Sequence, residues 1–288
     1  MSIFLPNTNK GSKVPIEPFL RWAGGKGRLV KNLTLYLPKD ISKRKYIEPF
    51  VGAGSLFLAL QPPNALISDS NDHLINTYKY IRENPDLIHT YLSQHAKKTS
   101  EKYYYKVRVI YNRSKPSAAQ AARFIYLNKT CFNGIFRVNV KGEFNVPYGW
   151  KHPPFLPSLN HLRRISKVLQ NVKIVSNDYK EALKQASSKD FIYLDPPYPP
   201  LNGTSYFTHY TADRFGEDDQ MQLAKLFYDL DSKRCKLMMS NADIPLIRKL
   251  YKRFHINKLS VVRCITCKNK KHIVNELVIT NYKSFLSS

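Results

Sequence analysis

The stretch "FIYLDPPYPP", residues 191 to 200, holds the residue types most suited to chemistry. Its first four residues form an apolar, β-favouring run that is typical of a buried strand. Asp195 follows at the carboxyl end of that run, where open α/β sheets bind their ligands. Pro196 and Pro197 fix φ and donate no N–H, so the turn offers carbonyl acceptors beside the ring of Tyr198. We expect a stiff set of acceptors for an amino group on a flat ring, although Asp and Pro also favour ordinary turns.

A second motif, "EPFVGAGS", places Gly52 and Gly54 between a predicted strand and a predicted helix. Glycines there permit a tight turn and close approach of the backbone to a ligand. Asp69 ends the next predicted strand, nineteen residues after Phe50, and this resembles the spacing at which an acid meets ribose in dinucleotide folds. The pattern is not G-x-G-x-x-G, and nothing nearby suits a pyrophosphate. It favours an adenosine-bearing cofactor without phosphates, with a plain strand-to-helix turn as the alternative.

The lysine of "WAGGKGRL", Lys26, invites a phosphate-loop interpretation that the spacing excludes. The motif G-x-x-x-x-G-K-[ST] needs a glycine where this chain has Leu20 and a hydroxyl where it has Gly27. Lys26 therefore remains a candidate donor to a carboxylate or an ordinary surface lysine.

Strands and helices alternate around these motifs, which is typical of a doubly wound α/β sheet. Residues 76–157 interrupt the alternation, and we expect them to form an inserted, mostly helical recognition domain between the core segments 1–75 and 158–288. The expected strands are 45–47, 65–69, 173–178, 191–195, 236–241 and a last antiparallel pair, 259–266 with 275–282. The main expected helices are 72–95, 102–112, 118–128, 180–186 and 218–231, with a loop and hairpin over 130–150.

The charge of the chain points to a polyanionic partner. Lys and Arg number 46 against 21 Asp and Glu, which gives a formal net charge of +25. Such an excess drives binding to nucleic acid through release of condensed counterions. We find no basic amphipathic helix of the kind that lies on membranes, so nucleic acid is favoured, and solubility alone is the alternative.

The basic residues are unevenly distributed. Residues 97–151 contain twelve Lys or Arg, two acidic residues and eleven aromatic residues. Residues 248–271 contain nine Lys or Arg and no acidic residue. Basic side chains follow phosphates, and aromatic ones stack on displaced bases, so the first segment fits a nucleic-acid reader.

Other features narrow the class of protein. The 288 residues, 43% of them hydrophobic, suffice for a real core, and we expect neither a secretory signal nor a membrane span. Four cysteines are too few for a disulfide scaffold, so we expect a reducing, cytoplasmic setting. Cys264 and Cys267 form a lone C-x-x-C with only His272 nearby, so we expect no metal site and assign them to alternate positions of a late strand.

Four stretches in one order resemble the Dam family of DNA adenine-N6 methyltransferases, from about Phe19 to Tyr282. They are "FLRWAGGK", "EPFVGAGS", "LNKTCFNGIFRVNVKGEFNVPYG" and "LDPPY". The resemblance implies a Rossmann-like, S-adenosylmethionine-dependent sheet with an inserted DNA-recognition domain. It implies S-adenosylmethionine as the methyl donor, S-adenosylhomocysteine as the product, and no metal.

The resemblance also assigns residues to the site. The catalytic residues would be Asp195, Pro196, Pro197 and Tyr198. The cofactor-binding residues would be Trp22, Gly24, Lys26, Phe50, Gly52, Gly54, Asp69, Asp178, Tyr179 and Asp195, with Asp178 and Tyr179 near the adenine of the cofactor.

These roles are chemically coherent. Adenine N6 is a poor nucleophile because its lone pair is delocalised into the ring. Hydrogen bonds to the Asp195 carboxylate and the Pro196 carbonyl would favour a pyramidal nitrogen, and fixed in-line placement supplies much of the acceleration. The cofactor carries the electrophile, and the proton leaves easily once the nitrogen is quaternised. Tyr198 would stack on the base, which must leave the duplex to reach the pocket.

The resemblance implies double-stranded DNA as the partner and "FNGIFRVN" as the reader. The expected DNA contacts are Arg21, Asn128, Phe132, Asn133, Arg137 and Lys151. Arg137 is the candidate for bidentate contact to guanine, with a phosphate contact as its alternative. Phe132 would fill the gap left by the extruded base or, alternatively, belong to the core. GATC is the expected target, although Trp150 stands where relatives commonly carry an arginine.

The residues leave two other functions open. The chain could be a catalytically silent nucleic-acid-binding protein on the same fold, or it could methylate RNA or a protein amide. A cognate restriction endonuclease encoded nearby is a candidate partner, but not a required subunit.

Overall fold

The computed structural model describes residues 14–149, 155–199, 215–264 and 271–284, with the backbone alone for 261–264 and 271–274. Within these residues the protein is built on a seven-stranded sheet in the order β3-β2-β1-β4-β5-β7-β6. The strands are β1 Lys45–Glu48, β2 Ala65–Asp69, β3 Val172–Ser176, β4 Asp190–Leu194, β5 Lys236–Ala242, β6 His255–Cys264 and β7 Lys271–Thr280. The mixed α/β architecture agrees with the predicted methyltransferase-type sheet.

The direction of the strands separates the sheet into two parts. Strands β1 to β5 run parallel, whereas β7 pairs antiparallel with both β5 and β6. The predicted late antiparallel pair is therefore confirmed. The strand order reverses between β1 and β4, which pair directly through Ile47 and Ile192. A crevice for a ligand is expected at the carboxyl ends of strands that flank such a reversal.

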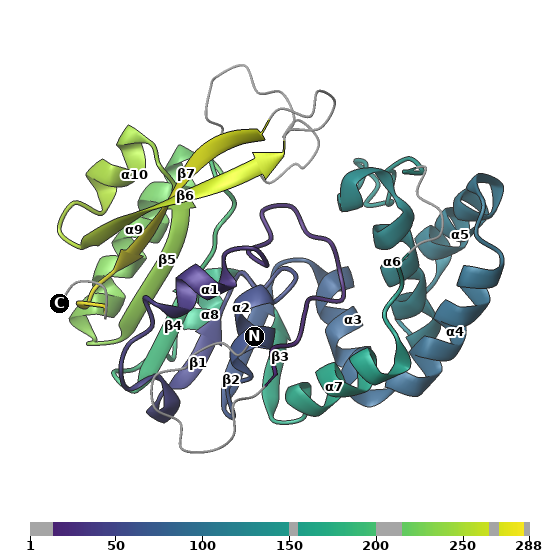
Figure 1. Ribbon diagram of the computed structural model, residues 1–288, viewed down its shortest axis with the longest axis horizontal. Coiled ribbons are helices and arrows are strands. Elements are labelled where there is room, and N and C mark those ends of the chain that lie inside the picture. The colour runs from purple at the N-terminus through teal and green to yellow at the C-terminus, as the bar shows by residue number, and fades with distance from the viewer. Residues whose placement is uncertain (1–13, 150–154, 200–214, 265–270, 285–288) are drawn as a thin grey trace.

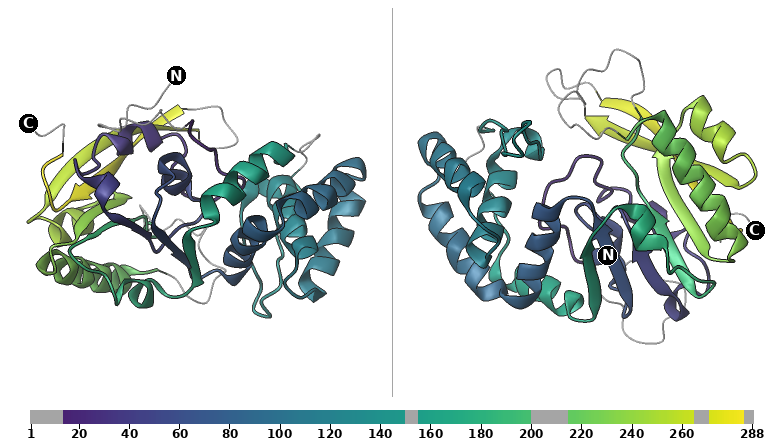
Figure 2. Two further views of the ribbon diagram at one scale, coloured as in Figure 1. Left: turned by 90° about the horizontal axis from the view of Figure 1, so that it is seen from below. Right: turned by 180° about the vertical axis from the view of Figure 1, so that it is seen from behind.

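Helices cover both faces of the sheet and extend beyond one edge. They are α1 Val30–Thr34, α2 Ser55–Leu60, α3 Asp72–Glu83, α4 Pro85–Lys97, α5 Glu101–Arg113, α6 Ala118–Thr130, α7 Leu159–Leu169, α8 Tyr179–Leu183, α9 Glu217–Ser232 and α10 Pro245–Leu250. Two 3-10 turns are η1 Ile41–Lys43 and η2 Phe132–Gly134. Figures 1 and 2 show α4, α5 and α6 together on one side of the molecule and β5, β6 and β7 on the other.

Side chains alternate between two hydrophobic clusters along each strand. In β1, Tyr46 belongs to the cluster that includes α1, α2 and α3, whereas Ile47 belongs to the cluster that includes α8, α9 and α10. In β4, Tyr193 and Ile192 divide in the same way. This period of two, with both faces covered by helices, explains why the strands are apolar on nearly every residue.

The expected helix over 72–95 is two helices. Asn71 begins the first, because its side-chain oxygen accepts the N–H of Leu74 at 3.1 Å. Pro85 begins the second, since a proline lacks the N–H that a continuing helix would need but fits the first position of a new one. The capped start of α3 places Asp72 and His73 just beyond the carboxyl end of β2.

The first hydrophobic cluster runs without interruption from the sheet through α3 into α4, α5 and α6. Its members include Ile67 of β2, Tyr78 of α3 and Tyr104 of α5. The expected boundary between residues 75 and 76 falls inside α3. The division of the chain into 1–75, 76–157 and 158–288 stays a prediction. In the part of the chain that is described, no helix combines the length and the apolar character needed to cross a membrane.

Candidate functional site

The turn that follows β4 carries the first part of the site. The strand is buried along its whole length and delivers Asp195 to the carboxyl edge of the sheet with its side chain 17% exposed. Three of the next four residues are proline, which stiffens the turn and leaves it few N–H groups. The carboxylate is thus held at the point of strand reversal.

Lys26 reaches this turn from the N-terminal segment. Its side chain is only 4% exposed, and Nζ lies 2.7 Å from Oδ1 of Asp195. The same ammonium donates to the carbonyl of Gly24 at 2.7 Å and lies 4.0 Å from Oε2 of Glu276. Lys26 is therefore a buried cation between two carboxylates, rather than the surface lysine that the sequence left open.

Tyr198 is fixed by the same group of charges. Its hydroxyl donates to Oε2 of Glu276 at 2.9 Å, and Nζ of Lys26 lies 4.6 Å from the centre of its ring. Burial, followed by the charges of Asp195 and Glu276, raises the pKa of the Tyr198 phenol well above its usual range. The hydroxyl therefore stays protonated and available as a donor.

The glycine turn after β1 forms the opposite part of the site. Gly52 and Gly54 adopt positive φ values of 46° and 66°. A Cβ on Gly52 would lie 2.8 Å from the Trp22 ring, and one on Gly54 would lie 2.7 Å from the Tyr78 hydroxyl. Tyr78 uses that hydroxyl to donate to the Gly52 carbonyl at 3.0 Å. Both glycines are required by conformation and by space, which a plain turn would not demand.

Two carboxylates lie behind the glycine turn. Asp69 accepts the N–H of Gly52 at 3.1 Å and that of Asn71 at 3.0 Å, while burial raises its pKa. Glu48, which is 2% exposed, accepts the Tyr46 hydroxyl at 2.8 Å. Burial, with a smaller contribution from the charge of Asp195, raises the pKa of Glu48 well above its usual range. Glu48 therefore favours the protonated form.

Aromatic rings form the third part. Phe50 stacks on Tyr179 with ring centres 5.1 Å apart, and Phe215 meets Phe50 edge-on at 5.8 Å. Asp178 caps α8 by accepting the N–H of Lys180 at 2.8 Å. The hydroxyl of Tyr179 is buried and has no hydrogen-bond partner among the described residues. A polar atom in that condition is suited to a ligand.

These three parts line one cavity of about 1090 Å³. Every residue that the sequence assigned to catalysis or cofactor binding lines it. These are Trp22, Gly24, Lys26, Phe50, Gly52, Gly54, Asp69, Asp178, Tyr179, Asp195, Pro196, Pro197 and Tyr198. Two acids of the site, Glu48 and Glu276, were not predicted from the sequence. Glu48 is the first residue of the motif "EPFVGAGS", whereas the local signal for Glu276 was an acid beside an apolar run in "NELVIT".

Five of the expected DNA-contacting residues belong to the described part of the chain, and they differ in exposure. Phe132 is 48% exposed, and Asn133 is exposed with a positive φ of 54° in the turn η2. Arg21 is exposed and packs against Gly134, where a Cβ would come within 2.4 Å of the Arg21 Cβ. Phe132 is therefore not a core residue, and its ring is accessible at the surface.

Asn128 faces inward and does not present its side chain to a duplex. It is 3% exposed and accepts the backbone N–H of Arg21 at 2.9 Å. Its amide group donates to the carbonyls of Arg21 and Gly134 at 2.8 and 3.0 Å. The expected DNA contact of Asn128 is thus replaced by a structural one. Its amide ties the N-terminal segment to the loop over residues 132–139, which we call the reader loop.

Arg137 lies at the base of a short hairpin closed by a bridge between Val138 and Phe144. Its Nε donates to Oδ1 of Asn145 at 2.7 Å, and one Nη lies 3.4 Å from the Asn145 carbonyl. The guanidinium is thereby oriented by the hairpin. Trp150, Lys151 and Cys267 lie outside the described residues, as do the side chains of Cys264 and His272. Among the described side chains, no group of three His, Cys, Asp or Glu could hold a metal ion.

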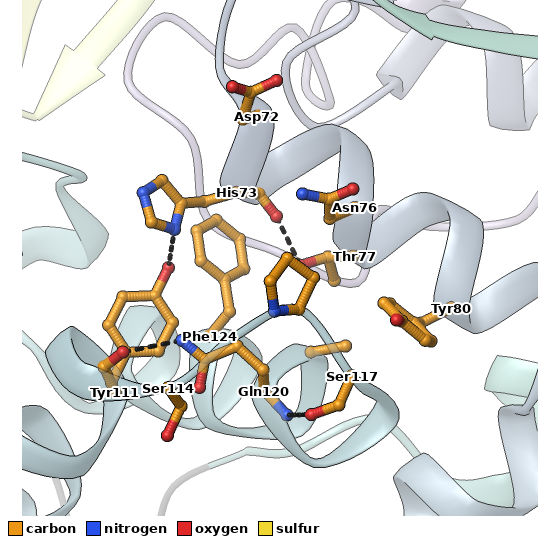
Figure 3. A pocket seen from close by; sticks show the side chains of 12 residues that line it. Asp72, His73, Asn76, Thr77, Tyr80, Tyr111, Ser114, Ser117, Gln120 and Phe124 are labelled. Carbon is orange, nitrogen blue, oxygen red and sulfur yellow. Dashed lines mark hydrogen bonds between the residues drawn. The ribbon is translucent and has the colours of Figure 1, made fainter.

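A second cavity, of about 290 Å³, lies between α3 and the start of α6 (Figure 3). Its polar groups largely bond one another. The Tyr111 hydroxyl pairs with Nδ1 of His73 at 2.7 Å, and Gln120 donates to the Tyr111 carbonyl at 2.7 Å. Thr77 donates to the His73 carbonyl at 2.8 Å. Among the described residues, no lysine or arginine lines this cavity, and none of its lining residues belongs to the turn after β4.

This chain is similar over most of its length to one family and to proteins that include the following three relatives. The family described as D12 class N6 adenine-specific DNA methyltransferase matches residues 22–265. The type II methyltransferase M.MjaIII of Methanocaldococcus jannaschii is 43% identical, over 93% of this chain and 99% of that protein. The type II methyltransferase M1.LlaDCHI of Lactococcus lactis subsp. cremoris is 37% identical, over 96% and 99%. The DNA adenine methylase of Escherichia coli K12 is 33% identical, over 86% and 88%.

Proposed function

The chain belongs to the D12 class of N6 adenine-specific DNA methyltransferases, and on that premise we propose that its large cavity binds S-adenosylmethionine and a flipped-out adenine together. The observation that carries this proposal is the meeting of two turns. The glycine turn after β1 and the Asp195 turn after β4 line one cavity at the reversal of strand order. A donor and an acceptor bound there would lie side by side.

The cavity has the features that an adenosine-bearing sulfonium requires. Gly52 and Gly54 leave space that a Cβ would fill, and Asp69 lies behind them as an acceptor for ribose hydroxyls. The stacked pair of Phe50 and Tyr179 suits the adenine of the cofactor, and the Tyr179 hydroxyl has no partner among the residues that the structure describes. Bound there, S-adenosylmethionine would supply the electrophilic methyl group.

The residues of the turn after β4, 195–199, which we call the catalytic turn, would hold the target amine. The carboxylate of Asp195 and the carbonyl of Pro196 would accept the two N–H groups of adenine N6 and direct its lone pair toward the methyl carbon. Lys26 compensates the buried charge of Asp195 at 2.7 Å. Once N6 has gained the methyl group, its proton passes to Asp195 or to solvent. The Tyr198 ring, fixed by Glu276, would stack on the base.

The exposed reader loop would engage the duplex. Phe132 and Asn133 would occupy the gap left by the extruded adenine, since both lie exposed in η2. Arg137 would read a guanine edge, and Arg21 would contact the target beside the cavity. Asn128 would position this loop from inside. The excess of positive charge would supply phosphate affinity, with Lys151 as one candidate contact.

We further propose GATC as the target, with intracellular duplex DNA as the partner. Two of the similar proteins are named type II methyltransferases, and a third is named a DNA adenine methylase. A companion restriction endonuclease is thus one proposed partner, and solitary action is the other. Trp150, in place of a common arginine, argues for testing the target directly.

The function is tested by incubating purified protein with methyl-labelled S-adenosylmethionine and unmethylated duplex DNA, RNA or a peptide amide. We expect label in the duplex alone, recovered as N6-methyladenine. Sequencing of DNA from expressing cells, with a readout for methylated adenine, would then map the target. Label in RNA or peptide, or cofactor binding without transfer to any substrate, would contradict the proposal.

A further inference from the structure

Two buried amides lie behind the catalytic turn. Gln220, near the start of α9, and Asn241, at the end of β5, both have 0% of their surface exposed. Nε2 of Gln220 donates to the carbonyl of Pro197 at 3.0 Å. Oε1 of Gln220 accepts Nδ2 of Asn241 at 3.1 Å, and Oδ1 of Asn241 accepts the N–H of Ala242 at 2.8 Å. A continuous chain of hydrogen bonds thus runs from the sheet to the second proline.

The groups at the two ends of this series of hydrogen bonds determine which way each amide is oriented. The Pro197 carbonyl can only accept, so Gln220 must present its NH₂ group there and its oxygen to Asn241. The Ala242 N–H can only donate, so Asn241 must present its oxygen there and its NH₂ group to Gln220. Both orientations agree, and neither amide can turn over without breaking two hydrogen bonds.

The catalytic turn needs support of this kind. Residues 195 to 199 include three prolines, which donate no N–H and cannot tie the turn down by themselves. Lys26 and Glu276 hold the turn at Asp195 and Tyr198. Gln220 holds it at Pro197, between those two points.

The same helix start also forms a wall of the cavity. Phe215, Gly216, Glu217 and Asp219 line the cavity and directly precede Gln220. One short segment therefore contacts both the space assigned to the cofactor and, through Gln220, the turn assigned to the target base. A shift of this segment would change the distance between the two.

We propose that Gln220 is a positioning residue for methyl transfer. Its hydrogen bond to the Pro197 carbonyl holds the Asp195 carboxylate and the Pro196 carbonyl in alignment with the cofactor wall, and Asn241 keeps Gln220 in the donating orientation. This inference rests on the proposed methyltransferase function. It assigns to Gln220 an effect on the chemical step, without contact to either substrate.

The first test is Gln220→Met, which keeps similar length and loses the donor. We expect the single-turnover rate of methyl transfer to fall about 10- to 100-fold, because misplacement of reacting groups by about an ångström costs that much. The affinities for S-adenosylmethionine and duplex should stay within about threefold of the unaltered protein, because Gln220 touches neither. Asn241→Leu should have a smaller effect, and the double variant should be no slower than Gln220→Met.

Gln120→Met is the matched control, because Gln120 is also a buried glutamine whose NH₂ group donates to a backbone carbonyl, that of Tyr111. It should lower thermal stability as Gln220→Met does, yet leave the single-turnover rate unchanged. A Gln220→Met protein that transfers methyl groups at the unaltered rate, or one slowed only by weaker cofactor binding, would overturn the inference.

Gln220→Glu provides a second test, which remains informative if Gln220→Met folds poorly. Only the protonated carboxyl can donate to the Pro197 carbonyl, so the rate relative to the unaltered protein should rise as the pH falls. A ratio independent of pH would refute the positioning role. Because the unaltered protein is assayed in parallel, a failure of the proposed function would appear there first, as an absence of transfer.

Discussion

Lys26 forms a buried ion pair with Asp195, with Nζ 2.7 Å from Oδ1, and so joins the N-terminal segment to the turn after β4. The two residues are far apart in the sequence and neighbours at the carboxyl edge of the sheet. Glu276 brings a second carboxylate to within 4.0 Å of the same ammonium. This cluster of charges at the turn after β4 is thus assembled from three separate parts of the chain.

Replacing Lys26 with methionine should leave one buried carboxylate, Glu276, and one largely buried carboxylate, Asp195, without their cation. We expect the free energy of unfolding to fall by about 3 kcal/mol, as measured by urea denaturation. The double variant Lys26→Met/Asp195→Asn should recover part of that loss, because it removes one of the uncompensated charges. A double variant no more stable than the single one would contradict this account of the pair.

Replacing Asp195 with alanine should remove methyl transfer while cofactor binding persists at least in part. We expect the single-turnover rate to fall at least about 100-fold, because N6 would lose the carboxylate that is proposed to orient it. Cofactor binding is measured by calorimetry on the same preparation. Asp86→Ala, which removes an exposed acid paired with Arg163, is the control and should transfer normally. Full activity without the Asp195 carboxylate would exclude it from the reaction.

Replacing Gly54 with alanine should destabilise the protein and weaken cofactor binding. The residue has a φ of +66°, and the new Cβ would displace the Tyr78 hydroxyl from the Gly52 carbonyl. We expect a loss of about 2 kcal/mol, combining backbone strain with a lost hydrogen bond. Gly27→Ala, where a Cβ meets nothing within 4 Å, should change stability by less than about 0.5 kcal/mol. Equal losses of stability for the two substitutions would argue against a specific requirement for glycine at position 54.

Replacing Arg137 with lysine keeps the charge but removes the planar pair of donors. Discrimination between target and non-target duplex should fall about 10- to 100-fold, as competition binding would measure at one fixed salt concentration. Arg113→Lys, at the exposed end of α5, should leave discrimination unchanged. If Arg137→Lys weakened binding to the target and the non-target duplex equally, Arg137 would be a phosphate contact instead of a base reader.

Acid should destabilise the folded protein through His95, which lies in α4. Burial, followed by the charges of Arg123 and Lys98, lowers the pKa of His95 from 6.5 to about 4. The unfolded chain therefore binds a proton below pH 6.5 that the folded protein accepts only near pH 4, and stability is lost as the pH falls between these values. Lowering the pH from 7.5 to 5 should reduce the free energy of unfolding by about 2 kcal/mol through His95.

In His95→Gln, the free energy of unfolding measured by urea denaturation should depend less steeply on pH than in the unaltered protein. His89→Gln, on the same helix α4, is the control and should keep the slope of the unaltered protein. Identical slopes for His95→Gln and the unaltered protein would show that His95 is not the responsible group.

The sequence by itself predicted the strands of the sheet and the residue types that stand at two of the strand ends. Apolar runs of strand length predicted the strands, and the glycine turn and the proline turn had to follow them because each motif directly abuts its strand. The carboxyl ends of parallel strands share one edge of the sheet, so the gathering of Asp195, Gly52 and Asp69 follows from the order of strands and motifs along the chain.

Only the tertiary structure decided which distant residues complete the site. Glu276 and Gln220 reach the turn after β4 because β7 enters the sheet antiparallel beside β5 and α9 packs against the sheet. No local pattern encodes that pairing. The inward orientation of Asn128 was equally hidden, since its partners, Arg21 and Gly134, meet only in the folded chain. Periodicity reports which face of an element is apolar, but the partner of a buried polar group depends on how elements pack against one another.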